Sequence, residues 1–112
     1  MSEDANGELL LYVTAPSRGV AMVLARSLLE ERLIACANVI DGAASLYWWE
    51  GKIEEAAEAL MIGKTTSRLV SKVVAKVKEL HDYSCPCVVA LPIVGGNPDF
   101  LLWVRAETKN AG

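Results

Sequence analysis

The chain opens with a short apolar run followed by apolar positions at helical spacing. Residues 9–13 are almost continuously apolar and end shortly before Pro16, as expected of a strand that is buried on both faces. Residues 18–33 then repeat apolar side chains with the period of a helix, and charged side chains take the other side. The pattern predicts a strand followed by a helix. The predicted core side of this helix carries Val20, Val23, Leu24, Ser27 and Leu28.

Residues 36–49 predict one long strand with an irregularity near its middle. Small and branched side chains alternate from residue 36 to Ile40. Asp41 and Gly42 then interrupt this pattern, and bulky side chains follow them. Glu50 and Gly51 then supply a tight turn, because glycine accepts the positive φ that short hairpins require. A returning strand is therefore expected after the turn.

The pattern within residues 53–62 fits two different structures. A helical repeat i, i+3, i+4, i+7, i+8 is matched by Ile53, Ala56, Ala57, Leu60 and Met61. The alternative is a strand over 52–65 that pairs with the preceding strand, with residues 60–62 buried and Glu54, Glu55 and Glu58 in solvent. Spacing alone does not choose between the two.

The second half of the chain predicts a helix, a strand and a closing helix. Thr66 or Ser67 can cap the first of these helices, whose apolar face carries Leu69, Val73, Val77 and Leu80. Residues 87–94 are rich in valine and predict a buried strand. Asn97 and Pro98 form an N-cap and first-turn pair, which begins a short helix containing Phe100, Trp103 and Val104.

This order of elements predicts an α+β fold. Strand, helix, hairpin, helix and strand form the β-α-β-β-α-β order of a ferredoxin-like sandwich, here with a C-terminal helix. The 112 residues allow a single domain, which we place at residues 9–112. Residues 1–8 are polar and acidic and are expected to form a disordered tail.

Several short stretches resemble the CutA family, which is associated with divalent-cation tolerance. They are residues 35–38 (ACAN), 45–52 (SLYWWEGK) and 90–93 (ALPI), together with the spacing His81-x-Tyr83-x-x-Pro86. The resemblance covers about residues 9–106. It implies a ferredoxin-like domain in a tight homotrimer, with a long hairpin that reaches neighbouring subunits, in an architecture like that of the PII signalling proteins. It also favours a strand over a helix for residues 52–65.

Composition and charge narrow the class of protein. Hydrophobic residues make up 53% of the chain and charged residues 22%, which indicates a densely packed globular protein. The net charge of −3 lacks the basic excess that nucleic acid requires, and no apolar run reaches the roughly 18 residues of a membrane span. The N-terminus has no secretory pattern, so we expect a cytoplasmic protein without nucleic-acid or membrane partners.

The adjacent indoles Trp48 and Trp49 predict self-association. Neighbouring residues of a strand point to opposite faces, so one sheet face covers only one of the two side chains. The other would be an exposed aromatic beside Tyr47, and such apolar surface usually marks an interface. The alternative is that both indoles pack in the core of their own subunit near a kink.

The strongest chemical signal is a group of metal-ligand types at His81, Cys85 and Cys87. Thiolate and imidazole are the ligands that copper and zinc favour, and cysteines two apart on an extended backbone project to the same side. The alternative gives all three ordinary structural roles. The resemblance implies glutamate after Pro86, where this chain has Cys87, a change that favours Cu(I). Copper binding in some relatives is linked to two further positions that are Val13 and Leu80 here, so that site does not transfer whole.

A second function class follows from the PII-like architecture. Clefts between subunits could hold a small anion or a partner protein, since aromatic walls with a few charges are typical of ligand pockets. The predicted cleft residues are Trp49, Glu50, Lys64, Tyr83 and Trp103. With one histidine and no nucleophile elbow, the sequence predicts a binding protein, not an enzyme, with no required cofactor beyond a possible copper or zinc ion.

Overall fold

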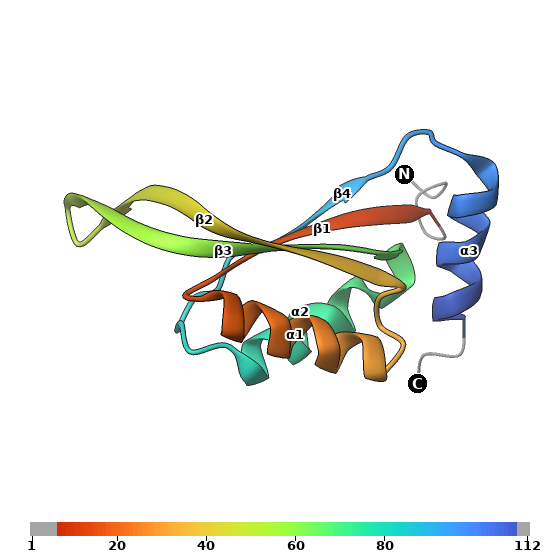
Figure 1. Cartoon of the computed structure of the whole chain (residues 1–112), viewed down its shortest axis with the longest axis horizontal. Coiled ribbons are helices and arrows are strands. Elements are labelled where there is room, and N and C mark those ends of the chain that lie inside the picture. Colours follow the sequence, from red (N-terminus) through yellow and green to blue (C-terminus); the bar gives the residue numbers. More distant parts are fainter. Residues whose placement is uncertain (1–6, 110–112) are drawn as a thin grey trace.

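The computed structural model describes residues 7–109 and has the predicted order of elements (Figure 1). These are β1 (Glu8–Ala15), α1 (Arg18–Glu30), β2 (Cys36–Trp49), β3 (Lys52–Thr66), a 3₁₀ turn (Ser67–Leu69), α2 (Val70–Leu80), β4 (Val88–Pro92) and α3 (Pro98–Thr108). β1 starts at Glu8, the last residue of the expected tail, and residues 1–6 lie outside the described residues. No helix of the described part is long and apolar enough to cross a membrane.

The four strands form one antiparallel sheet in the order β2-β3-β1-β4. β1 lies between β3 and β4, with Val13 opposite Met61 on one side and Val88 on the other. Helices α1 and α2 cover the same face of the sheet, whereas α3 lies at one end and the β2–β3 hairpin extends from the other (Figure 1). The fold is therefore an α+β layer of helices on a sheet with a projecting arm.

The segment after the turn is a strand, so the helical alternative for residues 53–62 is wrong. β3 pairs with β2 from Trp49↔Lys52 to Cys36↔Lys64, and a bulge between Ile40 and Ala43 shifts the register. Glu50 and Gly51 have φ of 51° and 80°, the positive values that let a two-residue turn follow the twist of the strands. Pairing along the whole hairpin outweighs the local helical repeat.

The core lies between the sheet and the two helices, and it corrects the predicted face of α1. The fully buried core side chains include Leu11, Val13, Leu24, Leu28, Met61, Val73 and Val77. On α1 the buried stripe is Ala21, Leu24, Ala25 and Leu28, and Val23 is 58% exposed. The buried stripe runs through Ala21 and Ala25, and Val23 lies about 200° around the helix from each of them, so it points outward.

The predicted start is confirmed for α3, and the helical segment that leads into α2 begins after Thr66 as expected but without a side-chain cap from Thr66. Asn97 Oδ1 accepts a hydrogen bond from the Asp99 amide at 3.0 Å, as expected of an N-cap. A 3₁₀ turn precedes α2, and the buried Thr66 hydroxyl makes no capping bond. β4 is also shorter than the predicted 87–94.

The corrected face of α1 predicts the effect of two matched substitutions. Leu24→Ala should lower the free energy of unfolding by about 2–5 kcal/mol, because it opens a cavity in the core. Val23→Ala, one residue away on the exposed side, should change it by no more than about 0.5 kcal/mol. Denaturant unfolding followed by circular dichroism measures both, and equal losses would contradict the assignment of the buried face.

Candidate functional site

His81, the first predicted metal ligand, is buried and uses both ring nitrogens inside the protein. It follows α2 directly and is 8% exposed. Its Nε2 lies 2.8 Å from the Thr14 carbonyl oxygen, and the Tyr83 amide lies 3.1 Å from its Nδ1. A carbonyl only accepts and an amide N–H only donates, so the neutral ring carries its hydrogen on Nε2. No lone pair is left for a metal.

The other two predicted ligands, Cys85 and Cys87, are exposed free thiols in the loop between α2 and β4. The Cys87 carbonyl accepts a hydrogen bond from the Thr14 amide at 3.3 Å, which ties the end of this loop to β1. Within residues 7–109, no group of three histidine, cysteine or acidic side chains is placed to hold one ion. The protomer therefore does not assemble the three-ligand site expected from the spacing.

Glu58 and Tyr83 form a polar contact that sequence reasoning missed. Glu58 was expected in solvent, but it is only 8% exposed, and the Tyr83 hydroxyl donates to its Oε2 at 2.7 Å. β1 ends at Ala15, opposite Ala59, so Glu58 is the first residue of β3 beyond the end of β1. Tyr83 packs there, and its ring lies 4.6 Å from that of His81. Burial, and then the bond to Glu58, raises the pKa of Tyr83 to about 12.

These contacts fix the loop of residues 81–87 at the base of the hairpin. Thr14 accepts from His81 at the start of the loop and donates to the Cys87 carbonyl at its end, and Glu58 holds Tyr83 between them. The loop is thus attached to both β1 and β3. The spacing of the sequence does not single out Glu58, because Glu54, Glu55 and Glu58 look alike as a run of solvated residues. Glu58 differs from the other two because it is the residue of β3 that lies just beyond the end of β1.

The five predicted cleft residues do not meet within one protomer. Trp49 and Glu50 lie at the tip of the hairpin, and Tyr83 lies at its base. Lys64 lies near the other end of β3, where its Nζ donates to Asn38 Oδ1 at 3.3 Å. Trp103 belongs to α3, at the opposite end of the molecule from the hairpin tip, along a longest extent of 43 Å (Figure 1). A single copy cannot bring them together.

The two indoles lie on opposite faces of the hairpin and are both exposed. Trp48 pairs with Ile53 and Trp49 with Lys52, so their side chains point to different sides. Their exposed fractions are 73% and 53%. The alternative that both pack in the core of their own subunit is therefore wrong.

A second apolar surface is the face of the sheet that α1 and α2 leave open. The register puts Tyr12, Ile62 and Val89 side by side on this face, opposite to the buried core positions of the same strands. Its apolar side chains are Leu10, Tyr12, Ile40, Leu60, Ile62, Val89 and Leu91. Three of them, Ile40, Val89 and Leu91, are about half exposed. Exposed apolar surface of this extent is typical of an interaction site.

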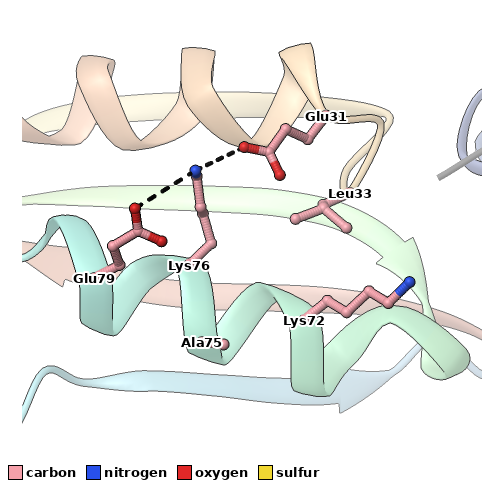
Figure 2. A pocket seen from close by; sticks show the side chains of 6 residues that line it. All are labelled: Glu31, Leu33, Lys72, Ala75, Lys76 and Glu79. Atoms are coloured by element: carbon pink, nitrogen blue, oxygen red, sulfur yellow. Dashed lines mark ion pairs between the residues drawn. The ribbon is translucent and has the colours of Figure 1, made fainter. Parts of the chain in front are cut away.

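A hollow of about 470 Å³ between α1 and α2 contains none of the predicted site residues (Figure 2). Lys76 projects into it from α2 and pairs with Glu31 at 2.7 Å and Glu79 at 3.9 Å. The hydrogen bond to Glu31 raises the pKa of Lys76. Because two carboxylates flank this lysine, it offers little charge to a bound anion.

The contact between Tyr83 and Glu58 predicts a loss of stability when the hydroxyl is removed. Tyr83→Phe leaves a buried carboxylate without this donor, which should lower the free energy of unfolding by about 1–3 kcal/mol. Tyr47→Phe, on an exposed tyrosine of β2, is the matched control and should change it by less than about 0.5 kcal/mol. In a double-mutant cycle, the variant that carries both Tyr83→Phe and Glu58→Gln should lose less stability than the sum of the losses of the two single variants. Strict additivity would show that the contact contributes nothing.

The raised pKa of Tyr83 predicts a dependence of stability on pH in the alkaline range. The neutral phenol is favoured in the folded state, so its contribution is fully present below the ordinary pKa of 10.0 and is lost as pH rises through about 12. Tyrosinate absorbance measures this directly. The wild type should show a late-titrating tyrosine that Tyr83→Phe lacks; identical late phases in the two proteins would assign it to another residue.

Comparisons with known proteins agree with this architecture. The family model described as CutA1 divalent ion tolerance protein matches residues 9–107. The divalent-cation tolerance protein CutA of Thermus thermophilus is 44% identical over 101 residues, which are 90% of this chain and 98% of that protein. The chloroplastic protein CutA 1 of Oryza sativa is 42% identical over 103 residues, 92% of this chain but only 58% of the rice protein. A crystal structure of CutA1 from Oryza sativa superposes with a TM-score of 0.90 at 40% identity, covering 96% of this chain and 98% of that one. The chain belongs to the CutA1 divalent ion tolerance protein family.

Proposed function

We propose that this chain forms a homotrimer that acts in divalent-cation tolerance, and that it is a binding protein and not an enzyme. The observation that carries the proposal is the exposed pair Trp48 and Trp49 at the end of an arm that projects from the protomer. Burying both indoles would remove a large apolar area from water, and aromatic side chains of this kind dominate the energy of interfaces. The names of the relatives support the role in metal tolerance.

The position of the apolar surfaces favours a closed ring of copies. The hairpin tip and the open sheet face are different surfaces, so a contact between the tip of one copy and the sheet face of the next is heterologous. Three such contacts form a closed ring if each copy is rotated by a third of a turn relative to the last. The strand order β2-β3-β1-β4 with both helices on one face supports the ferredoxin-like arrangement and a PII-like assembly. The three free cysteines support a cytoplasmic location, because a reducing compartment maintains thiols.

A ligand cleft between subunits is the second candidate function. In one copy, Trp49 and Glu50 lie far from Trp103, so only assembly could join them in one cleft with Lys64 and Tyr83. Lys64 favours this candidate, because its Nζ donates to the neutral amide of Asn38 and forms no ion pair within residues 7–109, which leaves its charge to meet an anion. Such a cleft would hold a small anion or an acidic group of a partner protein.

The proposal predicts that the hairpin tip controls both assembly and tolerance. Wild-type protein should sediment at three times the 12.1 kDa of the protomer. Trp48→Ala combined with Trp49→Ala should sediment at the mass of one protomer, since indoles at such contacts contribute about 2–4 kcal/mol each. Both positions are exposed in the protomer, so its own fold should be retained.

Val94→Ala, at a position that is 99% exposed and outside the hairpin, is the matched control and should remain trimeric. In a bacterial host that lacks its own CutA1 protein, the wild type and the control should restore growth on divalent metal salts, and the double variant should not. A wild-type protein that sediments as a single protomer, or a monomeric variant with full tolerance, would refute the proposal.

A further inference from the structure

The loop of residues 81–87, which carries two thiols, is attached to the sheet at both of its ends. The Thr14 carbonyl accepts from His81 at the start of the loop, and the Thr14 amide donates to the Cys87 carbonyl at its end. Tyr83 is held separately by Glu58. Only three residues, 84–86, lie between the anchored Tyr83 and the anchored Cys87. The backbone that carries the two thiols is therefore held on both sides by contacts within the protomer.

The covalent structure of Cys85-Pro86-Cys87 keeps the two sulfurs near each other. The backbone bends at Cys85, and the ring of Pro86 fixes its own φ. Cα atoms two residues apart are separated by at most roughly 7 Å, so the two side chains start close together. An ion placed between the two sulfurs can bind both of them without an S–S bond. Both thiols are exposed and free, so such an ion can reach them.

The surroundings of the two thiols select the kind of ion. His81 has no lone pair to offer, and the described residues supply no third ligand. Structural zinc sites use four ligands, and calcium or magnesium requires six or more oxygen atoms. Cu(I) is soft, prefers thiolate sulfur and is stable with two ligands.

We propose that Cys85 and Cys87 bind one Cu(I) ion per protomer as a bis-thiolate. Each thiol gives up its proton as its sulfur binds the ion, so two protons leave for each Cu(I) bound, and no electron is transferred. This inference deepens the proposed function in metal tolerance and rests on it for its biological role. The binding chemistry itself needs only one protomer.

Competition for Cu(I) against a chromogenic Cu(I) chelator tests the proposal, under anaerobic conditions with a reductant that contains no thiol. The wild type should take up one equivalent per protomer. Cys85→Ser and Cys87→Ser should each weaken binding by more than about 100-fold, beyond the loss expected when a merely supporting residue is removed. Cys36→Ser, the third cysteine, is the matched control and should bind like the wild type. No uptake by the wild type, or full uptake by either single variant, would overturn the proposal.

X-ray absorption of the copper-loaded protein gives a second test that needs no variant. The expected spectrum contains two sulfur neighbours and no nitrogen; an imidazole nitrogen would show that His81 leaves its hydrogen bonds and would overturn the two-ligand site. Sedimentation of the same samples separates this inference from the proposed function. A trimer that takes up no Cu(I) refutes the site alone, whereas a protomer that takes up Cu(I) refutes the trimer alone.

Discussion

The difference in length between β1 and β3 produces both the projecting hairpin and the polar site at the base of that hairpin. β1 has 8 residues and β3 has 15, and the two pair from Glu8↔Thr66 to Ala15↔Ala59. The part of β3 before Ala59 therefore has a paired strand only on the β2 side. A two-stranded ribbon is marginally stable on its own in water, and in the trimer that we propose a neighbouring copy covers this arm. Its exposed tryptophans supply the apolar area for such a contact.

The same difference creates the site at the base of the hairpin. Where β1 stops, one edge of β3 is open, and the loop after α2 occupies it. Tyr83 covers Glu58 there, while the backbone of Thr14 holds both ends of the loop. A buried carboxylate and a buried imidazole each require a hydrogen-bond partner, and Tyr83 supplies one to both: its hydroxyl to Glu58 and its amide to His81. The exposed thiols of Cys85 and Cys87 therefore lie on a loop that is held by hydrogen bonds within the protomer.

Local patterns predicted the order of elements because each has its own signal: apolar runs for β1 and β4, helical spacing for α1 and α2, and Asn97-Pro98 for α3. They failed where tertiary contacts decide. The exposure of Val23 depends on which side of α1 faces the sheet, and the strand conformation of β3 depends on pairing with β2. Whether His81 can bind a metal depends on its hydrogen bond to Thr14, which is 67 residues away in the sequence. The ligand types were visible in the sequence, but the hydrogen bonds that occupy the imidazole were not.

In the trimer that we propose, the hairpin tip is covered in the native protein although it is exposed in the protomer. Fluorescence quenching by acrylamide measures this directly in a Trp103→Phe variant, in which Trp48 and Trp49 are the only indoles that remain. We expect both indoles to be strongly protected from the quencher in the native protein and freely accessible to it after unfolding. Quenching of the native protein as fast as that of the unfolded chain would show that nothing covers the arm, and would contradict the account.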